Sequence, residues 1–94
     1  MNADEPTLIE ITSGLRFPEG PVAMADGSVL VVEIFGPRIT RVAPDGTKTT
    51  LAEVAGGPNG LALGPDGALY LCNNGGCFTP LEVSGFLVPG PFDP

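Results

Sequence analysis

Short apolar runs alternate along most of the chain with turns that contain glycine and proline. Residues 28–34 are almost continuously apolar, which is typical of a strand buried on both faces. Residues 38–43 alternate between polar and apolar, as in a half-exposed strand, whereas the threonine-rich residues 47–54 suit an outer, solvated strand. The whole pattern predicts strands at residues 7–12, 21–25, 28–34, 38–43, 47–54, 61–63 and 68–72. The fold class is therefore all-β and antiparallel, because helical periodicity is missing and the 14 glycines and 11 prolines disfavour helices.

Two copies of one pattern lie forty residues apart. Residues 17–36 align with residues 57–76, and the alignment pairs turn residues as well as apolar ones. The matching positions are Pro18-Glu19-Gly20 with Pro58-Asn59-Gly60, Asp26-Gly27 with Asp66-Gly67, and Gly36 with Gly76. A period of about forty residues with short strands and turn signals is typical of β-propeller blades. Asp26, Asp45 and Asp66 each precede a glycine, and we interpret all three as turn formers.

The repeat divides the chain into parts of a propeller. Residues 18–54 are predicted to form one complete four-stranded blade, residues 58–88 part of a second blade, and residues 7–12 a leading strand. The proline-rich tail, residues 77–94, is predicted to be a loop with at most a short strand near residues 81–88. A propeller closes with about four to eight blades, so we expect residues 1–94 to be the amino-terminal fragment of a longer protein. Its exposed blade edges offer a route to self-association.

Composition narrows the possible partners and the compartment. Eleven acidic and four basic residues give a net charge of −7, which argues against nucleic acid and anionic membranes as partners. No apolar run is long enough to span a bilayer, and the amino terminus lacks the pattern of a secretory signal, so we expect a cytoplasmic location. Cys72 and Cys77 are predicted to be free thiols, with a small disulfide as the alternative, and Cys72 to be a small buried hydrophobe.

Glu19 and Asn59 occupy the same position of the repeat, each between a proline and a glycine at the start of a strand. Equivalent positions of successive blades converge near the axis of a propeller, and carboxylate and carboxamide oxygens are ligands that calcium or magnesium prefers. The alternative is that Asn59 is a turn residue and Glu19 a solvated loop acid. Asn73 and Asn74 suit a turn, and Glu33, which aligns with Asn73, suits a polar strand end. The chain has no histidine, so a histidine general base is excluded.

Two motifs in order resemble one known family, the SMP-30/gluconolactonase/LRE-like proteins. The first is Phe17-Pro18-Glu19-Gly20-Pro21 with the Asp26-Gly27 turn after it. The second runs from Gly57-Pro58-Asn59-Gly60-Leu61 through Gly64-Pro65-Asp66-Gly67 to Cys72-Asn73-Asn74-Gly75-Gly76. The resemblance implies a six-bladed propeller with a divalent cation, often calcium, on its axis, and hydrolysis of lactones such as sugar lactones.

The resemblance carries over to single residues of this chain. It implies that Glu19 is the first metal ligand, and that Asn59 and Asn73 line the axis or the substrate side. A single carboxylate cannot hold a cation that takes about six to eight oxygens, so the resemblance implies an incomplete metal-dependent sugar-lactone hydrolase that is inactive alone. The alternative is a non-catalytic propeller fragment or an interaction module of the NHL-like kind.

Overall fold

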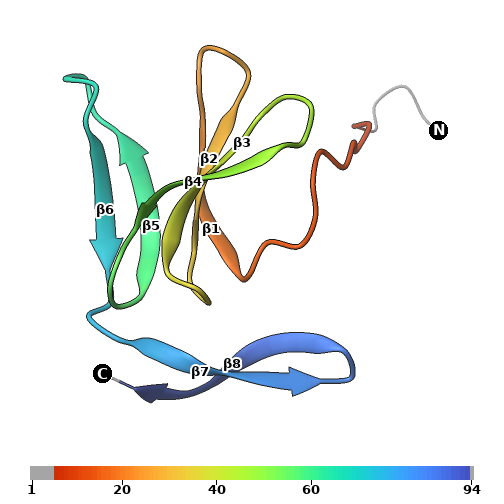
Figure 1. The fold of residues 1–94 in the computed structure, drawn as a ribbon, viewed down its shortest axis with the longest axis vertical. Coiled ribbons are helices and arrows are strands. Elements are labelled where there is room, and N and C mark those ends of the chain that lie inside the picture. Colours follow the sequence, from red (N-terminus) through yellow and green to blue (C-terminus); the bar gives the residue numbers. More distant parts are fainter. Residues whose placement is uncertain (1–5, 94) are drawn as a thin grey trace.

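The computed structural model describes residues 6–93, which form eight antiparallel strands in three separate sheets (Figure 1). The strands are β1 (Pro18–Ala23), β2 (Val29–Glu33), β3 (Arg38–Val42), β4 (Lys48–Glu53), β5 (Pro58–Leu63), β6 (Leu69–Asn73), β7 (Cys77–Val83) and β8 (Phe86–Asp93). β1 to β4 make one four-stranded sheet, and β5–β6 and β7–β8 are two hairpins. Within residues 6–93 no helix is long and apolar enough to cross a bilayer. The predicted all-β, antiparallel fold class is confirmed.

The four-stranded sheet holds the hydrophobic core. The buried hydrophobic residues of the described chain are Leu30, Val31, Val32, Ile34, Phe35, Ile39 and Val42. Three of them lie on β2, two lie on β3, and Ile34 and Phe35 directly follow β2. Most of them therefore belong to the apolar run that was predicted to be a buried strand. β4 is exposed along its whole length, as its threonine-rich sequence predicted. Strand order β1-β2-β3-β4 thus places the buried strands between two more exposed ones.

Three aspartates form the turns that the sequence predicted. The carboxylate of Asp26 accepts a hydrogen bond from the backbone nitrogen of Ser28 at 2.9 Å. Asp45 and Asp66 do the same with the backbone nitrogens two residues further on, at 2.9 Å and 3.1 Å. Each aspartate is followed by a glycine with a positive φ, between 82° and 90°. The turn-forming role of all three aspartates is confirmed.

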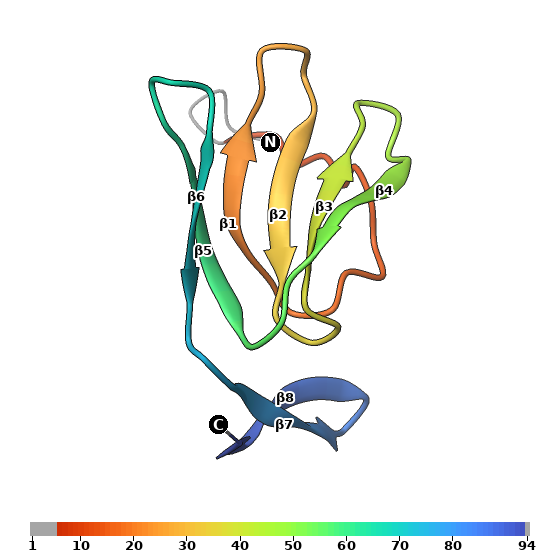
Figure 2. The same cartoon turned by 60° about the vertical axis from the view of Figure 1, so that its left-hand side comes forward.

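The β5–β6 hairpin lies beside the first sheet, with β5 next to β1 (Figure 2). Its strands overlap the two apolar runs predicted for the second repeat: β5 begins three residues before its run, and β6 is shifted by one residue. Cys72 on β6 is exposed, so the prediction that it is buried was wrong. The reason is that β6 is paired only with β5 among the described strands, so much of its surface faces solvent. Cys72 and Cys77 are both free thiols, as predicted.

The predicted leading strand at residues 7–12 is not formed, and this prediction was wrong. A strand requires a hydrogen-bonded neighbour, and the segment pairs with no other strand of residues 6–93. The segment is held by side chains instead. The Thr12 hydroxyl donates to the carbonyl of Gly46 at 3.1 Å, and the Lys48 ammonium group donates to the carbonyl of Ser13. Residues 7–13 therefore form an irregular segment that is held at Thr12 and Ser13 to the turn between β3 and β4 and to the start of β4.

The tail forms a hairpin, so the prediction of a loop at residues 77–94 was also wrong for its described part. β7 and β8 are joined by a two-residue turn at Ser84 and Gly85, whose φ angles are 52° and 83°. Positive φ at both positions is the geometry that suits the twist of a tight hairpin. Pro80 pairs with Pro89, next to an irregularity in the register. Both strands of a two-stranded sheet are edge strands. Proline is tolerated on an edge strand because no further strand has to bond to its missing N–H group.

Candidate functional site

Glu19 and Asn59, which the repeat placed in equivalent positions, line one pocket of about 210 Å³. Asn74 is its third polar lining residue. The apolar lining consists of Phe17, Ile34, Phe35, Phe78 and Pro89. Clefts for drug-sized ligands measure roughly 300–1,000 Å³, so this pocket suits a smaller molecule. The pocket joins the starts of β1 and β5 to the β7–β8 hairpin, which lies across that end of the molecule in both views (Figures 1 and 2).

A break in strand register accompanies both Glu19 and Asn59. On β1 the pairing with β2 shifts between Glu19 and Val22, and on β5 the pairing with β6 shifts between Pro58 and Gly60. Such bulges bend a strand and redirect a side chain, and they are common next to active sites. Gly20 has a φ of 58°, which permits the bend on β1. Both copies of the Pro-X-Gly motif thus carry a register break, which begins one position earlier on β5 than on β1.

Phe17 enters the pocket from a strained backbone position. Its φ of 55° lies in the left-handed region, which is uncommon for a bulky residue. The ring packs edge to face on Phe35 with centroids 5.2 Å apart, and the carbonyl of Phe17 accepts a hydrogen bond from the nitrogen of Ile34 at 3.1 Å. Backbone strain of this kind persists where surrounding contacts hold it, and it is concentrated at functional sites. The sequence alone offered no signal for this conformation.

The β7–β8 hairpin contributes Phe78 and Pro89 to the pocket. The Cys77 thiol donates to the carbonyl of Ile34 at 3.5 Å, which connects the start of β7 to the end of β2. Phe78 packs edge to face on Phe92 with centroids 5.3 Å apart, across the two strands of the hairpin. Sequence reasoning missed these residues because it treated the proline-rich tail as a loop.

The side chain of Asn73, predicted to line the axis or the substrate side, is hydrogen-bonded to the backbone of its own loop and of the residues before β5. Its side-chain oxygen accepts hydrogen bonds from the nitrogens of Gly57 at 3.1 Å and Gly75 at 2.8 Å, and its side-chain nitrogen donates to the carbonyl of Ala55 at 2.7 Å. The neighbouring Asn74 lines the pocket instead. The structure therefore places Glu19, Asn59 and Asn74 around the pocket and uses Asn73 to shape the backbone beside it.

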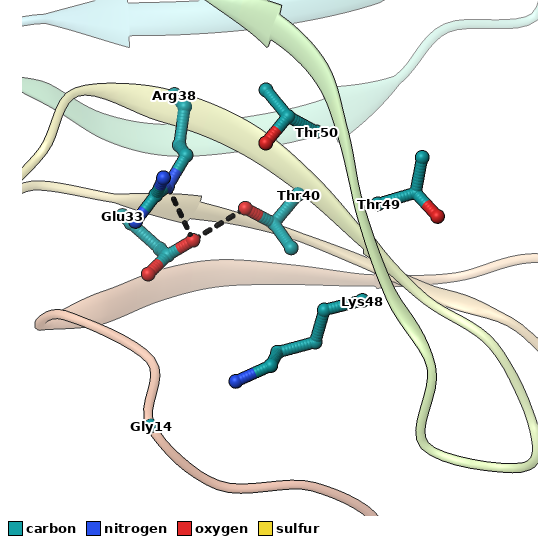
Figure 3. A pocket seen from close by; sticks show the side chains of 7 residues that line it. All are labelled: Gly14, Glu33, Arg38, Thr40, Lys48, Thr49 and Thr50. Atoms are coloured by element: carbon teal, nitrogen blue, oxygen red, sulfur yellow. Dashed lines mark hydrogen bonds and ion pairs between the residues drawn. The ribbon is translucent and has the colours of Figure 1, made fainter.

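Glu33 lies at a second hollow, of about 130 Å³, which is lined by residues of β2, β3 and β4 and by Gly14 (Figure 3). Only 3% of its surface is exposed. Its carboxylate accepts hydrogen bonds from the nitrogen of Arg16 at 2.8 Å, from Nε of Arg38 at 2.9 Å, and from the hydroxyl of Thr40. Burial acts to raise the pKa of Glu33, but the bonds from Thr40, Arg16 and Arg38 outweigh it and lower the pKa below its usual value of 4.5.

The residues of the Glu33 cluster support the sheet and are not among the residues that line the first pocket. It connects the residue that precedes Phe17 to β2 and β3 through one buried carboxylate. The polar strand-end character predicted for Glu33 is therefore present, but the side chain is buried rather than solvated. A buried charge is stable only when hydrogen bonds satisfy it, and three donors do so here.

The profile of the SMP-30/Gluconolactonase/LRE-like region family matches residues 17–85. The chain belongs to this family. The match begins at the strained Phe17 and ends in the turn of the β7–β8 hairpin, so it includes every residue of the Glu19 pocket except Pro89. No curated protein gives a significant match to the chain. Membership implies a propeller, of which residues 6–93 form three separate sheets and no closed ring.

The SMP-30/gluconolactonase/LRE-like fold also implies a divalent cation, which the donors of this pocket do not fit by themselves. The pocket supplies one carboxylate, from Glu19, and the carboxamides of Asn59 and Asn74. Calcium takes about six to eight oxygen ligands, among them carboxylates. Within residues 6–93 no three histidine, cysteine, aspartate or glutamate side chains gather closely enough to hold a metal ion. Glu19 can serve as one ligand of a larger set, and these residues alone do not make a metal site.

Proposed function

We propose that this chain provides the opening blades, and the first metal ligand, of a divalent-metal-dependent lactone hydrolase. The single observation that supports this proposal most is the meeting of Glu19 and Asn59 in one pocket. The two residues come from equivalent positions of a repeat in a chain of the SMP-30/gluconolactonase/LRE-like family. Generic propeller repeats have no need of a carboxylate at that position.

Each polar residue of the pocket has a role in this proposal. The Glu19 carboxylate would contribute one hard oxygen ligand to a divalent cation, and the cation would supply Lewis acidity toward a lactone carbonyl. The carboxamides of Asn59 and Asn74 orient the lactone by donating hydrogen bonds to its oxygens. The aromatic side chains of the pocket exclude water from the lactone ring. Because the donors are too few to hold a cation, we expect the 94-residue chain alone to show no lactone turnover.

The first experiment uses the chain by itself. Calcium is titrated into it by calorimetry while hydrolysis of a sugar lactone is measured in the same buffer. We expect neither binding at millimolar calcium nor turnover. Binding and turnover that both disappear in Glu19→Gln would show that the chain is active alone and would overturn the expectation of inactivity.

The second experiment supplies the missing ligands. The chain is fused to the later blades of a complete family member, in place of that protein's own opening blades. We expect calcium-dependent lactone hydrolysis that falls by at least roughly 100-fold in Glu19→Gln, since the loss of even outer-shell partners of a metal site costs about 10–100-fold. Glu10→Gln, at an exposed position outside the pocket, is the matched control and should leave the rate unchanged.

Two results would contradict the proposal. A folded chimera that binds calcium but hydrolyses no lactone would favour the alternative, a non-catalytic propeller module. A chimera that keeps its rate in Glu19→Gln would remove Glu19 from the metal site, whatever reaction the chimera carries out.

A further inference from the structure

The Glu19 pocket is lined by several aromatic side chains and by few polar groups. Five of its eight lining residues are apolar, and three of these five carry phenyl rings, at positions 17, 35 and 78. Phe35 is buried and Ile34 is buried beside it. The polar lining is limited to one carboxylate and two carboxamides. A ligand that fills this volume must therefore contact rings over much of its surface.

Each of the two rings at positions 17 and 78 packs against another phenyl ring. Phe17 is fixed by its edge-to-face packing on Phe35 and by the hydrogen bond from Ile34 to its carbonyl. Phe78, which is 39% exposed, packs edge to face on Phe92, and the hairpin that carries both rings contacts the residue after β2 through the Cys77 thiol. Rigid aromatic groups bind a ligand with little loss of conformational entropy.

We propose, building on the function proposed above, that this pocket selects lactones with an apolar ring substituent over polyhydroxylated sugar lactones. The ester group of the lactone faces Glu19, Asn59 and Asn74, and the substituent packs between Phe17, Phe35 and Phe78. The chemical class is a small lactone that bears an alkyl or phenyl group.

The preference follows from the cost of burying hydroxyl groups. A hydroxyl that moves from water to an apolar surface without a partner loses its hydrogen bonds to water, which disfavours binding. A sugar lactone carries a hydroxyl on nearly every carbon, and the hydroxyls turned toward the phenyl rings find no partner there, because the pocket has only three polar side chains. An apolar substituent loses no hydrogen bonds and gains contact with the rings, so it is favoured at the same site.

The test measures binding to the whole 94-residue chain and needs neither metal nor turnover. Two five-membered lactones, γ-phenyl-γ-butyrolactone and gulono-γ-lactone, are titrated separately into isotope-labelled protein and followed by NMR. We expect the phenyl lactone to bind at least tenfold more tightly and to shift the backbone amide signals of Phe17, Asn59 and Phe78. Equal binding of the two lactones, or tighter binding of the hydroxylated one, would overturn the proposal.

Two variants of one hairpin sharpen the test. Phe78→Ala should weaken binding of the phenyl lactone by roughly tenfold, because it removes an aromatic contact together with buried area. Binding of the hydroxylated lactone should stay the same. Phe86→Ala is the matched control, because Phe86 lies on the same hairpin, is 71% exposed and does not line the pocket. An equal loss in both variants would contradict the assignment of Phe78.

The wild-type preference decides the question even if Phe78→Ala disrupts the hairpin. In that case Phe78→Leu, which keeps an apolar side chain and removes the ring, should show an intermediate affinity for the phenyl lactone. The outcomes also separate the two proposals. An inactive chimera together with tighter binding of the phenyl lactone would overturn the hydrolase function only. An active chimera that prefers the hydroxylated lactone would overturn the present inference only.

Discussion

Gly20 lies directly against the backbone of Leu61, so closely that a Cβ atom on Gly20 would stand 2.6 Å from the nitrogen of Leu61. The contact joins β1 to β5 at the level of the Glu19 pocket, since Gly20 follows Glu19 and Leu61 lies two residues after Asn59. The glycine of the first Pro-X-Gly motif therefore sets the distance between β1, which carries Glu19, and β5, which carries Asn59.

Gly20→Ala is expected to destabilise the fold more than a glycine substitution elsewhere. Gly67→Ala is the control, because Gly67 also has a positive φ, 82°, but a Cβ there meets nothing within 4 Å. Both variants carry the cost of left-handed backbone, about 1–2 kcal/mol. Gly20→Ala adds the cost of overpacking, typically about 1–3 kcal/mol. Urea unfolding followed by circular dichroism measures the difference, and equal unfolding free energies would show that β1 and β5 can separate freely.

Glu33→Gln is expected to lower the free energy of unfolding near neutral pH. The variant leaves Arg38 without its charged partner and turns an amide donor toward other donors, which costs about 1–3 kcal/mol. Glu10→Gln, on the exposed leader, should have no effect. Because folding lowers the pKa of Glu33, its stabilisation is present above pH 4.5 and is lost as pH falls through the folded-state pKa. The gap between wild type and Glu33→Gln should therefore shrink in acid, and a constant gap would contradict the role of the charge.

Asp26 offers a second test of electrostatics, at an exposed turn. Hydrogen bonds from the hydroxyl and the backbone nitrogen of Ser28, followed by Arg41, lower its pKa from 3.8 to about 2. Ser28→Ala removes the first of these and should raise the pKa of Asp26 part of the way back to 3.8. The stabilisation from this carboxylate is present above pH 3.8 and is lost as pH falls toward 2. Carbon-detected NMR of the carboxyl group during an acid titration measures the change, and the pKa of Asp45 should stay constant as an internal reference.

Asn73→Ala is expected to loosen the loop beside the pocket. The variant removes three hydrogen bonds to backbone groups, at an exposed position where such bonds are worth about 0.5–1.5 kcal/mol each. Hydrogen exchange of the Gly57 and Gly75 amides should become faster, because both donate to the Asn73 side chain. Asn74→Ala should leave these rates unchanged. Unchanged exchange in Asn73→Ala would mean that the loop is held by other contacts.

The hairpins of the repeat were predictable because their signals are local. Asp-Gly turns and apolar runs specify a hairpin through residues a few positions apart. β2, β3, β4 and β6 lie within one residue of the predicted bounds, whereas β5 begins three residues earlier than predicted. The common location of Glu19 and Asn59 was also predictable, since equivalent positions of a repeat meet in space. Neither inference needed knowledge of any distant contact.

The remaining features depend on partners that the sequence does not announce. Residues 7–12 have a strand-like composition but pair with no strand of residues 6–93. Pro80 and Pro89 suggested a loop, although they lie in a hairpin that tolerates proline because both of its strands are edge strands. The burial of Glu33 depends on Arg16, Arg38 and Thr40, which converge only in the folded sheet. Asn74 rather than Asn73 lines the pocket because the side chain of Asn73 is hydrogen-bonded to the backbone of Ala55 and Gly57.

Each of the three sheets is built from strands that are consecutive along the chain. Every ladder can therefore close as soon as its own strands have left the ribosome, without waiting for a distant segment. The buried hydrophobic residues of the described chain lie between positions 30 and 42, so the part with the strongest driving force for collapse is completed first. This topology therefore permits each sheet to assemble in the order in which its strands are synthesised.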